Sequence, residues 1–397
     1  MNQVFSKIKS IKARPRSRIN SLRGKEILDS RGSWTIEVEL ETPQGLFIDS
    51  CPSGASTGKY EAKTVPSEIA VKNVNNIIAA ELKGKDVGEQ KEVDQILKKL
   101  NVGANATTAV SEACARAGAA AQNLPLYQYI AELYREQFSV ATENCSLYIL
   151  RPCFNIINGG MHASNGLDFQ EFMLVPWHKK YSENLKIASE VYQDLRKKLG
   201  KNVGDEGGFA PPFKHPQQAL ELLSRENVKI IIDVAASQFS DQKKKIYNLS
   251  YYQNLIEEYP IIGLEDPFPE NDWQNFQKIT EKLGQKITVI GDDLLVTNPE
   301  RIKEAHRKKS CNGLLLKVNQ IGTVTEALEA AKLAKSYGWK IMVSHRSGET
   351  NDDFIADLAV GIQADFIKAG APARGERVAK YNRLLRIEEE LCPVVKF

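Results

Sequence analysis

The chain of 397 residues is long enough for two ordinary domains, and its composition, with 42% hydrophobic and 26% charged residues, is that of a globular protein. Its formal net charge of +3 gives no reason to expect a nucleic-acid partner, and no apolar run is long enough to span a bilayer. The six cysteines are scattered without a CxxC pair, so we expect reduced thiols in a cytoplasmic protein and no zinc cluster.

The first part of the chain predicts a basic extension followed by an α+β domain. Residues 1–20 are rich in Lys and Arg, and we interpret them as a frayed extension, with an organelle-targeting or anion-binding arm as the alternative. Between residues 25 and 50 apolar and polar residues alternate as in strands, and helical patterns follow over about residues 67–100 and 104–137. Strands followed by helices favour a compact α+β domain over residues 21–144.

From about residue 151 onwards, short apolar runs alternate with helical segments. Two helix starts are marked by Asn298 before Pro299 and by a capping box that begins at Thr323. Six of the apolar runs lead, directly or through one small residue, to a polar side chain, namely Asp233, Glu265, Asp292, Lys317, His345 and Lys368. These residues are 23 to 32 positions apart, which is about the length of one strand, one helix and two short loops.

This spacing predicts an α/β fold whose second domain, residues 145–397, is a (β/α)8-type, TIM-like barrel. A doubly wound open sheet is the alternative, but the chain shows no GxGxxG fingerprint that would support it.

In a barrel the carboxyl ends of all strands meet at one mouth, so Asp233, Glu265 and Asp292 are expected to lie close together. Three close carboxylates repel one another unless a cation lies among them, and an all-oxygen site favours Mg²⁺. Lys317 and Lys368 end later strands in the same way. A lysine at such a mouth can lose its proton more easily than one in water, so it can act as a base or, if charged, bind an anionic substrate.

Three further motifs carry polar groups that suit a ligand. The run His345-Arg346-Ser347-Gly348 suits a phosphate or carboxylate, although a plain polar turn is an alternative. Glu206 lies in an acid pair between glycines, and Gln170-Glu171 follows a glycine turn that contains His162. The loop at residues 52–58 is not a nucleotide-binding P-loop, because Ser53 and Tyr60 stand where that motif needs Gly and Ser or Thr.

Taken together and in this order, the segments resemble the enolase (phosphopyruvate hydratase) family over residues 21–391. The matching stretches share the family's loop, acid and lysine motifs, and they are EILDSRG at 26–32, PSGASTG at 52–58, GDEGGFAP at 204–211, DVAAS at 233–237, LEDPF at 264–268, GDDL at 291–294, LLLKVNQIG at 314–322 and MVSHRSGET at 342–350.

The resemblance implies an enolase-superfamily barrel capped by the N-terminal domain, usually as a homodimer or higher homo-oligomer. It implies reversible dehydration of 2-phospho-D-glycerate to phosphoenolpyruvate with two Mg²⁺ ions and an enediolate intermediate. By this analogy Lys317 removes the C2 proton, Glu206 protonates the departing C3 hydroxyl, and Glu171 assists. The remaining implied roles are metal binding by Asp233, Glu265, Asp292 and Ser56, and substrate binding by Gln170, His162, His345, Arg346, Ser347 and Lys368.

The chain also departs from the family pattern. Ser33-Trp34 stands where enolases usually have Asn-Pro, which bears on the surface around the usual dimer interface. Two other functions remain to be weighed: another lyase of the same superfamily, and a non-catalytic protein on the same scaffold. The phosphate-suited run at His345 argues against the first, and the presence of Lys317 and Glu206 together with all three acids argues against the second.

Overall fold

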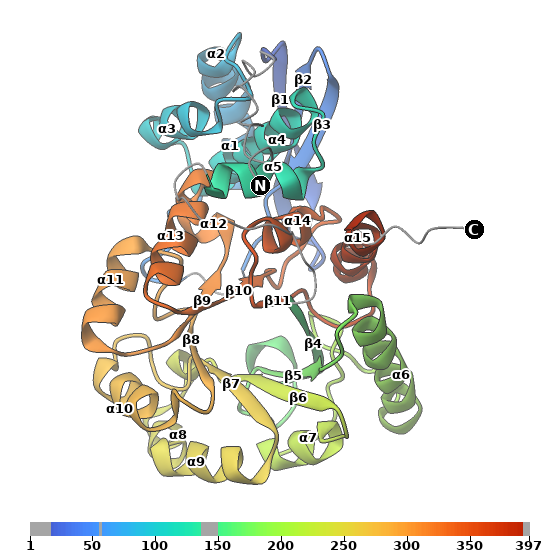
Figure 1. The fold of residues 1–397 in the computed structure, drawn as a ribbon, viewed down its shortest axis with the longest axis vertical. Helices are drawn as coiled ribbons and strands as arrows, with labels where there is room; N and C mark the ends of the chain where they lie inside the picture. Colours follow the sequence, from blue (N-terminus) through green and yellow to red (C-terminus); the bar gives the residue numbers. More distant parts are fainter. Residues whose placement is uncertain (1–16, 55–57, 136–149, 392–397) are drawn as a thin grey trace, which may run out of the picture.

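The computed structural model describes residues 17–54, 58–135 and 150–391. Most of the predicted basic extension, Ser56 and the predicted domain boundary at residues 144–145 lie outside the described residues. The N-terminal part is an antiparallel sheet in the order β1-β2-β3, covered by helices (Figure 1). Its elements are β1 (Ser21–Leu28), β2 (Trp34–Thr42), β3 (Gly45–Ser50), α1 (Ser67–Asn73), a π-helical turn (Val74–Ile78), α2 (Ala79–Leu82), α3 (Gln90–Leu100), α4 (Ala104–Ala121) and α5 (Leu126–Arg135).

The alternating side chains of β2 explain how this sheet is covered. Ile36, Val38 and Leu40 are fully buried on the face that packs against the alanine-rich helix α4. The two helical stretches that the sequence predicts are each interrupted. The first is broken after α2, where Gly84 has a φ of +76°, and the second after α4, where Asn123 has a φ of +55°. Both residues adopt the left-handed backbone that ends helices.

The second part of the chain is a closed eight-stranded barrel in the order β10-β11-β4-β5-β6-β7-β8-β9. Its strands are β4 (Arg151–Asn158), β5 (Glu171–Pro176), β6 (Val228–Asp233), β7 (Ile261–Glu265), β8 (Thr288–Gly291), β9 (Gly313–Leu316), β10 (Lys340–Ser344) and β11 (Phe366–Lys368). Strand β5 runs antiparallel to both β4 and β6, whereas the other neighbours are parallel. The barrel is therefore mixed, and a regular β/α repeat applies only from β6 onwards.

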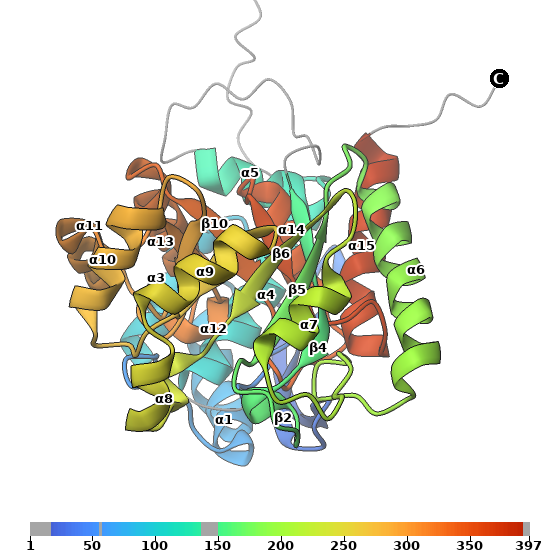
Figure 2. The ribbon, with the colours of Figure 1, turned by 90° about the horizontal axis from the view of Figure 1, so that it is seen from below.

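Helices surround the barrel on its outside (Figures 1 and 2). They are α6 (Tyr181–Leu199), α7 (Pro216–Leu223), α8 (Asp241–Ile246), α9 (Leu249–Glu258), α10 (Trp273–Leu283), α11 (Pro299–Lys308), α13 (Val324–Ser336), α14 (Phe354–Gly361) and α15 (Gly375–Leu391). The one-turn helix α12 (Val318–Ile321) instead directly follows Lys317 at the carboxyl end of the barrel and contacts α4. Helices α6 and α15 lie side by side, so the end of the described chain closes against the start of the barrel.

The predicted strands from β6 to β11 are confirmed to within one residue at their carboxyl ends. Two predicted helix starts are also confirmed. The side chain of Asn298 accepts hydrogen bonds from the backbone N–H groups of Glu300 and Arg301, and Thr323 accepts one from that of Glu326. These caps fix where the chain turns from each loop into the next helix.

The barrel interior is filled by buried side chains, including Met173, Ile231 and Leu315, so a ligand site lies above it at the strand ends. The N-terminal part meets this end of the barrel: Ser53 and Gly348 exchange two backbone hydrogen bonds of 2.7 and 2.9 Å. None of the described helices has the length and apolar character that crossing a membrane requires. Cysteines 51, 114, 153 and 311 are free and buried.

Candidate active site

A polar cavity opens at the carboxyl ends of the barrel strands. The sequence-predicted residues that line it are His162, Gln170, Glu171, Glu206, Asp233, Asp292, Lys317, His345, Arg346, Ser347 and Lys368. Glu265 lies behind this lining and contacts the cavity through Lys368. Ser56 lies outside the described residues. Residues from the ends of seven strands or from nearby loops therefore meet at one place, and β5 contributes its amino end, at Glu171, because it is reversed.

Asp233 and Glu265 end neighbouring strands and face the ammonium group of Lys368. Nζ of Lys368 lies 2.7 Å from Oε2 of Glu265 and 3.6 Å from Oδ2 of Asp233. All three side chains are almost completely buried. Burial raises the pKa of Glu265 well above its usual range, and the nearby Asp233 carboxylate adds to this effect. Glu265 therefore needs compensating positive charge in order to be ionised.

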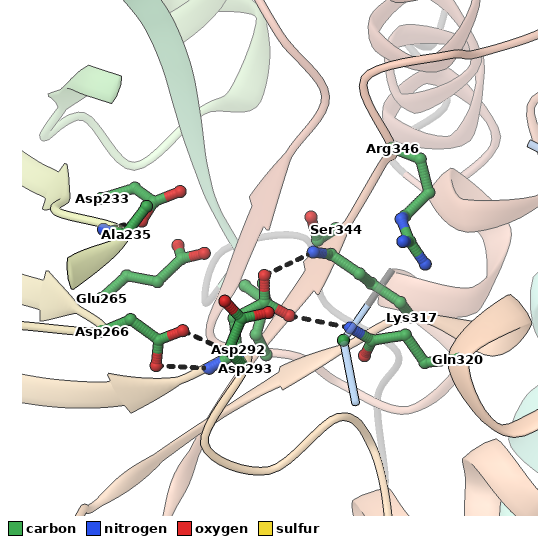
Figure 3. Close-up of polar contacts among 12 residues, drawn as sticks. Asp233, Ala235, Glu265, Asp266, Asp292, Asp293, Lys317, Gln320, Ser344 and Arg346 are labelled. Carbon is green, nitrogen blue, oxygen red and sulfur yellow. Dashed lines mark hydrogen bonds and ion pairs between the residues drawn. The ribbon is translucent and has the colours of Figure 1, made fainter. Parts of the chain in front are cut away.

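Asp292 follows β8 and pairs with the second lysine of the site (Figure 3). Nζ of Lys317 donates to Oδ2 of Asp292 at 2.6 Å, and Nε2 of Gln320 donates to Oδ1 at 2.9 Å. Burial opposes ionisation of Asp292, but Lys317, with Lys368 and Arg346, outweighs burial and lowers the pKa of this carboxyl. Asp292 is thus held ionised and fixed at both oxygens.

The described part of the chain holds two groups of potential metal ligands, and within each group the ligand atoms lie within 4.8 Å of one another. The groups are His162, Glu171 and Glu206, and Asp266, Asp292 and Asp293. Asp266 and Asp293 each directly follow a predicted ligand in the sequence, but the sequence pattern alone predicts no role for them. Asp266 accepts from the backbone N–H groups of Asp292 and Asp293 at 3.0 and 2.6 Å. It therefore positions the loop after β8.

The predicted set of Asp233, Glu265 and Asp292 suits Mg²⁺ by its chemistry. All three offer carboxylate oxygens, the ligands that this ion prefers, and they come from three consecutive strands. Here each carboxylate is compensated by the ammonium group of Lys317 or Lys368. A site that already requires positive charge at buried acids fits a divalent cation.

Glu206 and Glu171 form a buried carboxyl pair on the opposite part of the cavity wall. Asn155 donates from Nδ2 to Oε2 of Glu206 at 2.7 Å, and Nδ1 of His162 lies 3.5 Å from Oε1 of the same residue. Burial, together with the neighbouring Glu206 carboxylate, raises the pKa of Glu171 well above its usual range. Burial would also raise the pKa of Glu206, but the facing residues His162 and His345 outweigh it and lower that pKa. The pair therefore holds one proton, on the Glu171 side.

The glycines around Glu206 are required by close packing. A side chain at Gly204 would collide with the carbonyl oxygen of His162, and one at Gly208 would lie 2.6 Å from Oδ1 of Asn158. Gly207 has a φ of +83°, which a side chain disfavours. The turn that carries Glu206 is thus fixed directly against the loop that carries His162.

Arg346 is held at the cavity by Glu61 and Asn319, for which the sequence pattern predicts no role. Its Nη1 and Nη2 atoms lie 3.2 Å from Oε2 of Glu61, and Nη1 donates to Oδ1 of Asn319 at 2.9 Å. Both Arg346 and Glu61 are nearly buried. Gln170 also faces the cavity and donates to Oδ2 of Asp233 at 3.1 Å. No local pattern in the sequence marks Glu61, because its partner lies 285 positions away.

Comparison with known proteins identifies the family to which these features belong. The model described as "Enolase, N-terminal domain" matches residues 19–130, and "Enolase, C-terminal TIM barrel domain" matches residues 147–397. The chain is 45% identical to the enolase of Eimeria tenella, with 94% of this chain and 96% of that protein covered. It is 46% identical to enolase B of Dictyostelium discoideum, with 94% and 95% covered. It is 45% identical to the enolase of Mastigamoeba balamuthi, with 94% and 96% covered.

Proposed function

The chain belongs to the enolase family, and from this premise we propose how its own residues carry out the family's reaction. It is a magnesium-dependent phosphopyruvate hydratase, a glycolytic lyase that converts 2-phosphoglycerate to phosphoenolpyruvate. One observation supports the residue assignments most strongly. In the closed barrel, β5, which begins with Glu171, and β9, which leads to Lys317, are four strands apart in either direction. The carboxyl pair and Lys317 therefore face each other across the cavity.

This arrangement suits an elimination with a base on one face of the substrate and an acid on the other. Lys317 accepts the C2 proton at Nζ, and the electrons of the C2–H bond form the new C2–C3 double bond. The C3–O bond breaks as Glu206 gives a proton to the departing oxygen, which leaves as water. Glu171, which holds the proton of the carboxyl pair, supplies Glu206.

Mg²⁺, when bound, supplies the positive charge that offsets the second negative charge developing on the substrate carboxylate. We propose Asp233, Glu265 and Asp292 as the ligands of one ion, because they are buried oxygen donors at adjacent strand ends. A second ion is expected with Ser56, which lies outside the described residues, so that assignment stays a prediction.

Arg346, Ser347, Gln170 and Lys368 are proposed to hold the phosphate and carboxylate of the substrate. A guanidinium can bind two oxygens of a phosphate at once, and Arg346 is already held in the cavity wall by Asn319. His162 and His345 flank the carboxyl pair within 3.5 Å and are proposed to shape its hydrogen bonding around the departing hydroxyl.

We also propose that the enzyme is a homodimer or higher homo-oligomer. The N-terminal sheet presents exposed apolar side chains, including Leu28 at 57%, Trp34 at 63% and Ile48 at 43% exposure. Large apolar side chains exposed to this extent support a protein interface on the N-terminal sheet. Light scattering after size exclusion would test this, and a W34E variant should shift the assembly towards monomer. A uniformly monomeric native protein would contradict the proposal.

A cytoplasmic location is proposed as well, supported by the free thiols of the buried cysteines, which suit a reducing compartment.

The decisive test of the function is a direct assay. The purified protein with 2-phosphoglycerate and Mg²⁺ should form phosphoenolpyruvate, followed by its ultraviolet absorbance. A folded, Mg²⁺-loaded protein without turnover would refute the proposed function.

A further inference from the structure

Arg377, in the first turn of α15, is a fully buried guanidinium beside the active site. Its Nη1 atom lies 2.7 Å from Nδ1 of His345 and donates to the carbonyl oxygen of Arg346 at 2.7 Å. Its Nη2 atom donates to the carbonyl oxygen of Ser347 at 2.6 Å and to that of Asp205 at 3.2 Å. One side chain thus ties the His345–Ser347 segment to the turn that carries Glu206.

The contact with Arg377 determines the protonation of His345. A guanidinium has only donors and keeps its charge, so Nδ1 of His345 must be the acceptor. The imidazole therefore carries its single proton on Nε2. The charged groups that act on the ring are Glu206, Arg377 and Lys368. Burial, with Arg377 and Lys368, lowers the pKa of His345 to about 3 despite the opposing effect of Glu206. The ring is neutral at any ordinary pH.

The two oxygens of Glu206 consequently have different surroundings. Oε2 accepts from Nδ2 of Asn155 at 2.7 Å and faces Nε2 of His345 at 3.5 Å. Since both neighbours present hydrogens, a proton on Oε2 would point at another donor. Oε1 faces Nδ1 of His162 at 3.5 Å, and the same nitrogen lies 3.8 Å from Oε1 of Glu171. Oε1 is thus the oxygen on the side of the shared proton.

We propose that Arg377 is a positioning residue that fixes His345 as the neutral tautomer with its proton on Nε2, so that Glu206 exchanges its proton through Oε1 alone. The inference rests on the proposed role of Glu206 at the departing hydroxyl. In that step the Oε1–H bond breaks and a new O–H bond forms on the departing oxygen. That oxygen takes the electron pair of the C3–O bond and leaves as water, while Glu206 remains as a carboxylate.

The tautomer can be measured directly by two-bond ¹⁵N–¹H NMR on the ¹⁵N-labelled native protein without substrate. Only five histidines are present, and an H345Q sample assigns the signal. For His345 the expected spectrum shows Nδ1 without a proton and Nε2 with one. Both signals should stay unchanged between pH 6 and pH 8, about the range in which an ordinary histidine titrates. A proton on Nδ1, or a cationic ring, would overturn the proposal. Because no turnover is needed, this result is independent of the proposed function.

Substitution of Arg377 separates this role from general packing. In R377M, Nδ1 loses its donor and His345 should become protonated at low pH, beside the Glu206 carboxylate. The ratio of kcat at pH 8 to kcat at pH 6 should then rise by roughly 10-fold, because ionisation of His345 within this range changes the neutral fraction of the ring by about that factor. R377K, which keeps a cationic donor, should restore the native pH profile.

R383M is the matched control, because Arg383 lies on the same helix but pairs with Asp357, away from the cavity. It should leave both the spectrum and the pH profile unchanged. If R377M kept the native pH profile and tautomer, Arg377 would have no positioning role. If R377M fails to fold, the NMR spectrum of the native protein alone decides whether His345 is the neutral tautomer with its proton on Nε2.

Discussion

Nζ of Lys317 lies 2.6 Å from Oδ2 of Asp292, so the proposed base is ion-paired with a proposed metal ligand. Burial lowers the pKa of Lys317, but the Asp292 carboxylate outweighs burial and leaves this pKa raised. The expectation from sequence was that burial and a nearby metal make such a lysine lose its proton more easily than in water, or that a charged lysine binds an anionic substrate. In the ion pair with Asp292 alone, the charged form is favoured. Because a base must be neutral to accept a proton, this ion pair has to weaken before turnover.

Binding of Mg²⁺ is therefore expected to lower the pKa of Lys317, because a cation at Asp292 removes the attraction that stabilises the ammonium form. The pKa of Lys317 should fall by about one unit or more, and one unit is equivalent to about 1.4 kcal/mol. The measurement is the pH dependence of Lys317 labelling by an amine-selective reagent, quantified by peptide mass spectrometry with Mg²⁺ or with a chelator. The exposed Lys303 is the internal control. An unchanged or higher midpoint with Mg²⁺ would refute this coupling.

Replacing Lys317 with Ala should remove the base. General-base catalysis contributes roughly 10²- to 10⁴-fold, so kcat should fall at least that far. Exchange of the substrate's C2 proton with D₂O, followed by NMR, should also disappear. K303A, a change of the same type on the surface of α11, should leave both unchanged. Persistent C2 exchange in K317A would assign the base to another residue.

Replacing Glu206 with Gln should separate proton removal from loss of water. The amide keeps the shape of the side chain but cannot supply the proton, so formation of phosphoenolpyruvate should fall by roughly 10²- to 10⁴-fold. Lys317 is untouched on the other side of the cavity, so C2 exchange should remain readily measurable. Loss of both activities to the same extent would mean that Glu206 does not act at the hydroxyl.

The sequence predicts the parts of the site that follow from strand periodicity. Asp233 and Lys317 could be found because a barrel brings the carboxyl ends of its parallel strands to one mouth. Glu206 lies in a turn between α6 and α7, so strand periodicity does not find it; the glycines around it mark the turn, and the family motif gives its role. Arg377 could not be found at all: a charged residue in a helix is expected at the surface, and its burial depends on long-range packing. The reversed direction of β5 likewise leaves no mark in the local pattern.

Replacing Glu61 with Ala should destabilise the protein, because it leaves Arg346 buried beside the cavity without this carboxylate. Removal of one partner from a buried ion pair costs about 3–5 kcal/mol. The measurement is urea unfolding at pH 7. E300A, which removes an exposed partner of Lys303, should change the stability by less than about 1 kcal/mol. Equal effects of the two substitutions would show that the Glu61–Arg346 pair contributes no more than a surface pair.

Glu112, buried in α4 to 3% exposure, should make the protein less stable as the pH rises. Burial, reinforced by Asp49 and Asp352, raises its pKa well above the ordinary value of 4.5. Between these two pKa values the folded state binds more protons than the unfolded state, so the free energy of unfolding falls with increasing pH. The stabilisation that Glu112 contributes through its raised pKa is complete below pH 4.5 and decreases as the pH rises above this value. Urea unfolding of the native protein and of E112Q at pH 5 and pH 8 measures it. E112Q, which cannot ionise, should gain stability relative to the native protein at pH 8 and lose part of the pH dependence. A native protein and an E112Q variant with parallel pH profiles would show that Glu112 keeps its ordinary pKa.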